Sequence, residues 1–140
     1  MAGLSFLKKD TLMTLNNSAK SSLLAGTGLL ALAVIIGAFG AHGLKNFVTP
    51  EKLVTFETGV RYHFYHAFGL VLLGLYQLHS KARLNLSHYA FSAGILLFSF
   101  NCYFYVLSDV KVFAMIVPVG GVMFIIGWVN FFMQILRDQK

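Results

Sequence analysis

The sequence predicts an all-α membrane protein, a membrane-spanning four-helix bundle with both termini on the cytoplasmic side. Only 11% of its 140 residues are charged, 57% are hydrophobic, and the mean hydropathy is +0.71, whereas a soluble domain carries about 25% charged residues. Four stretches contain no Lys, Arg, Asp or Glu: residues 21–44, 62–80, 84–108 and 112–136. Because about 20 apolar residues cross a hydrocarbon core of roughly 30 Å, each stretch can span a bilayer once.

The gaps between these stretches are too short for a soluble domain, so we expect a single membrane domain. The predicted organisation is a polar N-terminal tail over residues 1–21 and a transmembrane domain over residues 22–137, with helices at about 22–43, 50–79, 88–107 and 112–136. Thr49, Pro50 and Glu51 are typical of an N-cap and a first helical turn. The second helix is therefore expected to begin outside the hydrocarbon.

The distribution of cations predicts the orientation. Four crossings put both termini on one side, together with the link near residues 81–83. That side carries seven cations, which are Lys8, Lys9, Lys20, Lys81, Arg83, Arg137 and Lys140. The other side carries four, which are Lys45, Lys52, Arg61 and Lys111. The positive-inside rule therefore favours cytoplasmic termini.

Small residues and a proline predict how the helices pack and bend. A stripe of small residues spaced four apart in the first helix allows a neighbouring helix to approach closely: Ala33, Gly37 and Ala41. Proline removes one backbone hydrogen bond of a helix. We therefore expect a kink in the last helix at Pro118, Gly120 and Gly121.

Polar residues inside the predicted spans need partners, because an unsatisfied polar group in hydrocarbon is costly. Counting residues from the span ends puts His66 and Asn101 at similar depths, and Gln77 and Asn130 at another shared depth. A hydrogen bond within each pair is one expectation. Glu57 and Arg61, four residues apart at the start of the second helix, are expected to pair.

Three histidines form the clearest candidate site. His42 ends the first helix on the side from which the second helix re-enters, and His63 and His66 share a face of the second helix. Imidazoles can bind zinc, copper or haem iron, or move protons. The structural alternative is that these histidines order the loop through hydrogen bonds to helix-end carbonyls and to Glu57. No carboxylate or cysteine lies at tight ligand spacing beside them, so the cofactor stays unknown and the absence of one is the favoured interpretation.

Two segments resemble a known family. These are Gly-Ala-Phe-Gly-Ala-His-Gly-Leu-Lys at residues 37–45 and Phe-Glu-Thr-Gly-Val-Arg-Tyr-His-Phe-Tyr-His-Ala at residues 56–67. Together they resemble domain of unknown function 423, whose animal members are called transmembrane protein 256. His42, Tyr62 and His66 fall on positions of the family pattern, whereas members commonly have Gln at the position of His63. The resemblance implies a four-helix protein of the bacterial or mitochondrial inner membrane and no particular reaction.

Catalytic signatures such as Gly-x-Ser-x-Gly and His-Glu-x-x-His are absent from the sequence. The cations are scattered over short loops, which argues against a nucleic-acid partner. The leading hypothesis is a non-enzymatic accessory, assembly or scaffold subunit that lies in the lipid bilayer and joins a larger membrane complex or a homo-oligomer. One alternative is a metal- or haem-binding protein that uses His42 and His66. Another is a small oligomeric carrier or channel.

Overall fold

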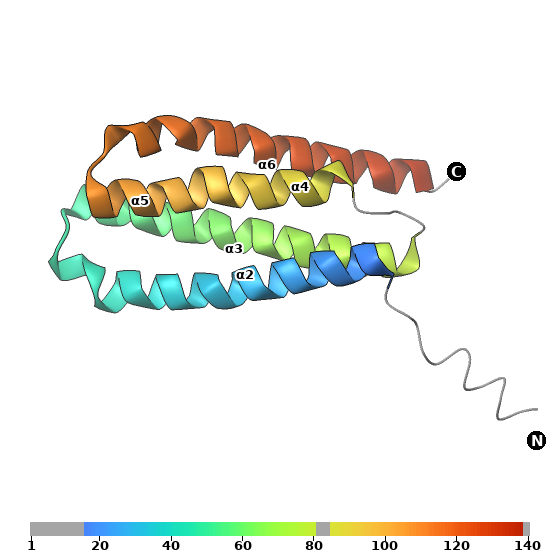
Figure 1. Cartoon of the computed structure of the whole chain (residues 1–140), viewed down its shortest axis with the longest axis horizontal. Coiled ribbons are helices and arrows are strands. Elements are labelled where there is room, and N and C mark those ends of the chain that lie inside the picture. Colours follow the sequence, from blue (N-terminus) through green and yellow to red (C-terminus); the bar gives the residue numbers. More distant parts are fainter. Residues whose placement is uncertain (1–15, 81–84, 139–140) are drawn as a thin grey trace, which may run out of the picture.

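The computed structural model describes residues 16–80 and 85–138, and these residues form helices and no strand (Figure 1). The predicted all-α class is therefore confirmed. The elements in chain order are α2 (Asn17–His42), the 3₁₀ turn η1 (Leu44–Asn46), α3 (Pro50–His79), α4 (Leu86–Gly94), the π-helical segment η2 (Ile95–Phe100), α5 (Asn101–Ser108) and α6 (Lys111–Asp138).

The helices run antiparallel in sequence order, and α4, η2 and α5 form one continuous rod (Figure 1). In the view of Figure 1, α2 lies at the bottom, α6 at the top, and α3 and the α4–α5 rod between them. The main neighbour of α2 is α3, whereas α6 packs against the α4–α5 rod. The bundle thus has a termini end, where α2 begins and α6 finishes, and a loop end, where α2 meets α3 and α5 meets α6.

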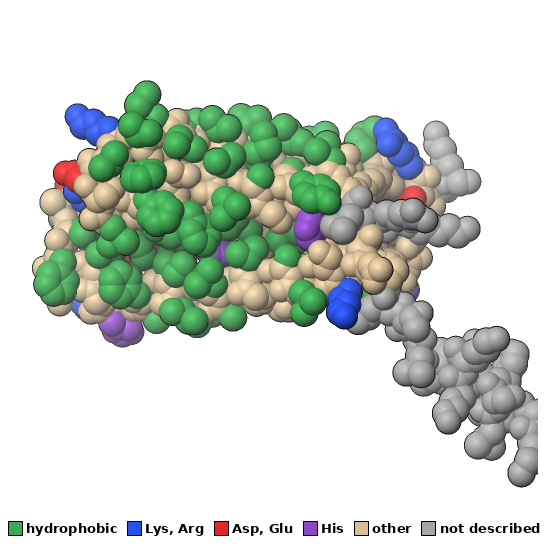
Figure 2. Space-filling view, in the orientation of Figure 1, with side chains coloured by type: hydrophobic (Ala, Val, Ile, Leu, Met, Phe, Trp, Pro, Cys, Tyr) green, Lys and Arg blue, Asp and Glu red, His purple; other side chains and the backbone are tan. Residues whose placement is uncertain are grey.

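Three helical segments are long and apolar enough to cross a membrane: Asn17–Asn46, Leu86–Ser108 and Lys111–Asp138. The predicted span at 62–80 corresponds to the later part of α3 and its C-cap Ser80, and α3 is not among these three segments. Helix α3 lies alongside the other helices over its whole length (Figure 1). It therefore lies at the same depth in the membrane as they do. Figure 2 shows hydrophobic side chains along the sides of the bundle and charged side chains toward its two ends.

Helix α2 begins earlier than the predicted helix. Asn16 is its N-cap, because the Asn16 side chain accepts a hydrogen bond from Ala19 N at 2.7 Å. The Asn16 side chain also donates to the backbone oxygen of Gln77 at 2.7 Å, which ties the start of α2 to the end of α3. Residues 17–21, which the sequence assigned to the polar tail, are therefore helical. The rest of that tail, residues 1–15, lies outside the described residues.

Glycines bring α2 and α3 into close contact. An added Cβ would lie 2.7 Å from Val71 at Gly26 and 2.6 Å from the Phe56 ring at Gly40. Ala33, seven residues from each glycine, is fully buried. Of the predicted stripe, Gly37 faces Val60 but Ala41 is exposed, so the choice of Ala41 is corrected to Gly40. The physical reason is that a step of four residues rotates by about 40° beyond a full turn, so two steps leave the shared face.

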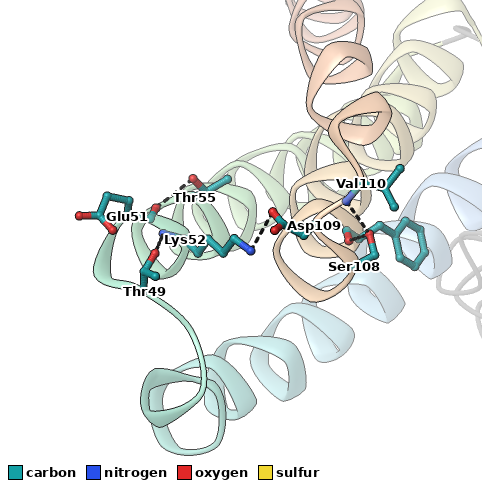
Figure 3. Close-up of polar contacts among 8 residues, drawn as sticks. Thr49, Glu51, Lys52, Thr55, Ser108, Asp109 and Val110 are labelled. Carbon is teal, nitrogen blue, oxygen red and sulfur yellow. Dashed lines mark hydrogen bonds and ion pairs between the residues drawn. The ribbon is translucent and has the colours of Figure 1, made fainter.

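An ion pair fastens the loop end (Figure 3). Lys52 Nζ in the first turn of α3 lies 2.8 Å from Asp109 Oδ1 in the α5–α6 turn. The hydrogen bond and positive charge of Lys52 lower the pKa of Asp109 from its usual value. Asp109 ends α5 in the left-handed region at φ 61°, and its N–H donates to Tyr105 O at 2.8 Å. This turn makes α5 and α6 an antiparallel hairpin.

Candidate functional site: the polar face of α3

Helix α3 carries most of the residues that the sequence selected as candidates. Glu57, Arg61 and Tyr62 are exposed, whereas His63 and His66 are buried. Its start is set by Thr49, whose side chain accepts from Lys52 N, and by proline in the first turn. A helix that begins there and runs to His79 packs on α2 with one face and on the α4–α5 rod with another. His63 is buried against that rod, whereas the buried Gln77 side chain accepts a hydrogen bond from Ser22 of α2.

The structure does not bring the three candidate histidines together. His42 is exposed at the last turn of α2. His63 contacts Phe100 and Tyr103 of the α4–α5 rod, whereas His66 contacts aromatic rings of α6. Across residues 16–80 and 85–138, no group of three or more His, Cys, Asp or Glu side chains could hold a metal ion. The geometry therefore gives no support to a site built from His42 and His66.

His63 is fully buried at the interface between α3 and the α4–α5 rod. Its Nδ1 shares a hydrogen bond of 3.2 Å with Tyr103 Oη. Its Nε2 atom and the Ser99 hydroxyl are buried, and neither has a hydrogen-bond partner among the residues that the structure describes. The α3 backbone can approach this segment because Gly59 has no side chain, and an added Cβ there would lie 2.9 Å from Cys102 Cβ. No sequence pattern pointed to Ser99.

The His66 side chain packs through the flat face of its imidazole ring. Its Nδ1 donates to the carbonyl oxygen of Tyr62 at 2.7 Å, since a carbonyl can only accept. Its ring stacks on Phe124 with centroids 3.3 Å apart and planes 7° apart. Tyr62 stacks in turn on Phe98, with centroids 4.5 Å apart. The imidazole therefore belongs to an aromatic stack that joins α3, η2 and α6, and the expected bond from His66 to Asn101 is not formed.

The Asn101 side chain instead forms hydrogen bonds with backbone carbonyls of the π-helical segment η2. Its Nδ2 donates to Leu96 O at 3.1 Å and to Leu97 O at 3.0 Å. A π-helix displaces carbonyls from the usual i→i+4 pattern. Carbonyls inside a membrane need a partner from the protein itself. The Asn101 side chain supplies that partner, so it stabilises the local geometry of η2.

We expect Asn101→Leu to lower the free energy of unfolding by about 2 kcal/mol, because two carbonyls in a part-buried position lose this donor while the number of side-chain heavy atoms is kept. Unfolding by a sodium dodecyl sulfate titration in mixed micelles measures this change. Val129→Leu, at an exposed position of α6, is the control and should unfold with the parent chain. If Asn101→Leu unfolds at the same detergent fraction as the parent chain, the stabilising role of Asn101 is wrong.

A network of hydrogen bonds closes the termini end of the bundle. Its bonds join Ser22 Oγ to Gln77 Oε1 (2.9 Å) and His88 Nδ1 (3.0 Å), Ser87 Oγ to Asn130 Oδ1 (2.8 Å), Asn85 Nδ2 to Gln134 Oε1 (2.7 Å), and Gln134 Nε2 to Asn130 Oδ1 (2.8 Å). Serines on α2 and α4 thus supply hydrogen bonds to Gln77 and Asn130, the two residues that the sequence places at one depth. Sequence reasoning gave these serines no role, since a serine in an apolar run carries little signal.

Among the residues expected to bend the last helix, Gly120 lies in the contact between α6 and η2. The helix is assigned without interruption from Lys111 to Asp138, with Pro118 inside it. Gly120 is buried, and an added Cβ would lie 2.4 Å from Phe98 N in η2. Gly121 faces more open space, with its nearest neighbour, the Phe98 ring, at 3.9 Å. The glycine at 120 therefore permits α6 to touch the backbone of the π-helical segment.

Glu57 and Arg61 do not pair with each other. Arg61 Nη2 donates to Thr58 Oγ1 at 3.0 Å. The ion pair between Lys52 and Asp109 is the one present among the residues that the structure describes. Both Glu57 and Arg61 instead line a groove between α2 and α3 that also includes Gly37, Gly40 and Ala41. The two family-like segments of the sequence therefore face each other across this groove.

Four antiparallel helices with an apolar exterior and a polar face turned inward define an integral membrane protein. Comparison with known families then identifies it further. Residues 36–121 match the family described as "Protein of unknown function (DUF423)", and the chain belongs to this family. The resemblance drawn from the two sequence segments is thereby confirmed.

Similar proteins are bacterial membrane proteins. The chain is 39% identical over 98 residues to the UPF0382 membrane protein SAB0533 of Staphylococcus aureus, which covers 70% of this chain and 80% of the relative. It is 39% identical over 100 residues to the UPF0382 membrane protein YwdK of Bacillus subtilis, covering 70% and 81%. These names agree with the predicted membrane location and, of the two membranes expected, with the bacterial inner membrane. No solved structure matches the chain.

Proposed function

We propose that this protein is a non-enzymatic membrane subunit that acts through helix–helix contacts in the bilayer, as an accessory or assembly component of a larger complex or as a homo-oligomer. The observation that carries the proposal is the outward stripe of α2. This stripe is exposed and recurs every three or four residues: Leu24, Gly28, Ala31, Ile35 and Ala38. It lies opposite the buried face of the same helix, which packs on α3.

The outward stripe has the composition of a helix-packing surface. Helix association in lipid depends on close backbone approach, which small residues permit. An added Cβ at Gly28 would meet nothing within 4 Å. Apart from Leu24 and Ile35, the stripe therefore presents little more than backbone. A helix of a second copy or of another membrane protein fits this surface.

The interior supports a structural role for the buried polar groups. His66 Nδ1 donates to a backbone oxygen, Asn101 satisfies η2, and the Ser22 hydroxyl bonds Gln77 and His88. The Ser22 bonds join three helices, and the bonds of His66 and Asn101 satisfy backbone oxygens within their own helix or rod. We propose on this basis that the protein performs no chemistry of its own and has no nucleic-acid partner.

Enlarging the outward stripe tests the role of α2. We expect Gly28→Leu combined with Ala31→Leu to reduce the amount of co-purifying partner, or of the oligomer, about tenfold, since overpacking costs about 1–3 kcal/mol. The measurement is quantitative native gel electrophoresis and mass spectrometry after digitonin extraction from the natural membrane. Thermal unfolding of the variant should match that of the parent chain, because neither position is buried.

Val129→Leu on the exposed side of α6 is the matched control and should leave the assembly intact. A parent chain that is extracted as a monomer without a stoichiometric partner contradicts the proposed function. An assembly that tolerates the double substitution contradicts the assignment to α2.

We also propose that both termini face the cytoplasm, as the cation count predicts. In a Cys102→Ala background, Val110→Cys at the loop end should react with a membrane-impermeant maleimide in intact cells. Gln139→Cys should react only after permeabilisation. The opposite labelling pattern would reverse the proposed orientation, and labelling of both positions in intact cells would contradict an even number of crossings.

A further inference from the structure

The groove between α2 and α3 near the loop end has a volume of about 230 Å³. Its floor exists because Gly37 and Gly40 leave room for the side chains of α3. An added Cβ would lie 3.3 Å from Val60 Cγ1 at Gly37 and 2.6 Å from the Phe56 ring at Gly40. The lining is apolar except for Glu57 and Arg61.

The two charges in this groove are available to a ligand. Glu57 and Arg61 are four residues apart on α3, and both are exposed. Within the described ranges 16–80 and 85–138, no hydrogen bond or ion pair engages the Glu57 carboxylate. Arg61 makes one bond, to Thr58, and a guanidinium has five N–H donors. A single small groove thus presents one anion and one cation side by side.

The depth of these charges matches a lipid headgroup. The 30 residues of α3 extend over about 45 Å, which exceeds a hydrocarbon core of roughly 30 Å. Glu57 and Arg61 lie about 10 and 16 Å from the first residue of α3. The charged mouth of the groove therefore sits near the boundary between headgroups and hydrocarbon, and its apolar floor continues on the hydrocarbon side.

We propose that this groove binds a zwitterionic aminophospholipid. Its primary ammonium group donates to the Glu57 carboxylate, its phosphate accepts from Arg61, and the upper part of one acyl chain lies against Val60 and Gly37. The charges select this headgroup. An anionic lipid without an amine would engage Arg61 but place negative charge beside Glu57, and a quaternary choline group has no N–H to donate.

Lipid retention by the purified full-length protein tests the proposal. The protein is exchanged into micelles that contain equimolar dioleoyl phosphatidylethanolamine, phosphatidylcholine and phosphatidylglycerol, and bound lipid is measured by native mass spectrometry. We expect phosphatidylethanolamine to be retained at least about threefold over each of the others, the size expected of one partly hydrated charged contact. Glu57→Gln should abolish the preference over phosphatidylcholine. Arg61→Gln should lower retention of all three lipids.

Matched controls separate the groove from general surface charge. Glu51→Gln and Lys45→Gln remove charges at the same end but outside the groove, and should leave lipid retention unchanged. Ala41→Leu fills the groove from an exposed position and should reduce retention, while thermal unfolding stays at the parent value. Equal retention of the three lipids, tighter retention of phosphatidylglycerol, or equal effects of the controls would overturn the proposal. So would a dimer that Ala41→Leu disrupts in the absence of bound phospholipid.

Discussion

Gly120→Ala is expected to lower the free energy of unfolding by about 2 kcal/mol or more, although it adds only one methyl group. That methyl would lie 2.4 Å from Phe98 N and 2.7 Å from the carbonyl carbon of Leu97, both of which are backbone atoms. A flexible side chain can move aside, but a backbone cannot move without displacing its helix. Helix α6 would have to separate from η2 and give up packing along the contact.

The matched control for this prediction is the next residue. At Gly121 an added Cβ would meet only the Phe98 ring, at 3.9 Å, so Gly121→Ala should leave stability within about 0.5 kcal/mol of the parent chain. Sodium dodecyl sulfate titration in mixed micelles measures both variants. Equal unfolding midpoints for the two variants would show that α6 and η2 are not in the contact described.

Phe91→Ala is expected to cost about 3–5 kcal/mol of stability, the range for removing a large buried aromatic side chain. The Phe91 ring is fully buried and fills the space left by two glycines, since an added Cβ would lie 3.3 Å from it at Gly69 and 2.6 Å from it at Gly127. It also packs edge-on against Trp128, with centroids 4.8 Å apart. No neighbour can fill the resulting cavity without a shift of α3 or α6.

Phe132→Ala removes the same ring from an exposed position of α6, where Phe132 is 60% exposed. We expect this control to change stability by no more than about 0.5 kcal/mol. Circular dichroism of both variants checks that helix content is retained before unfolding is compared. A loss at Phe132 as large as that at Phe91 would contradict the assignment of Phe91 to the core.

The helices and their antiparallel order follow directly from the sequence, because stretches free of charge and short links leave few alternatives. The partners of the polar residues do not follow. Residue counting fixes the height of His66 and Asn101 in the membrane but not the direction in which each side chain points. His66 turns toward Phe124, and Asn101 folds back onto its own helix. The shared height of His66 and Asn101 therefore did not predict their partners.

The π-helical segment η2 could not be predicted from the sequence either. Its sequence, Ile-Leu-Leu-Phe-Ser-Phe at 95–100, reads as ordinary apolar helix. Two residues that contact this segment carry sequence signals related to it. Asn101 donates hydrogen bonds to its displaced carbonyls, and Gly120, which has no side chain, leaves room for its backbone. The sequence singles out both residues for other reasons. Asn101 was expected to pair with His66, and Gly120 was expected to help bend the last helix. Their function in packing becomes visible only when the neighbouring helix is in place.

The inward-facing polar groups of α3 have a consequence for biogenesis. A segment with this many histidine, glutamine and tyrosine side chains partitions poorly into lipid by itself. Close packing at glycines brings α2 against α3, where Ser22 gives the Gln77 side chain a hydrogen bond. We therefore expect α3 to enter the bilayer more readily with α2 beside it, whereas His63 and His66 are covered only once the α4–α5 rod and α6 pack on them.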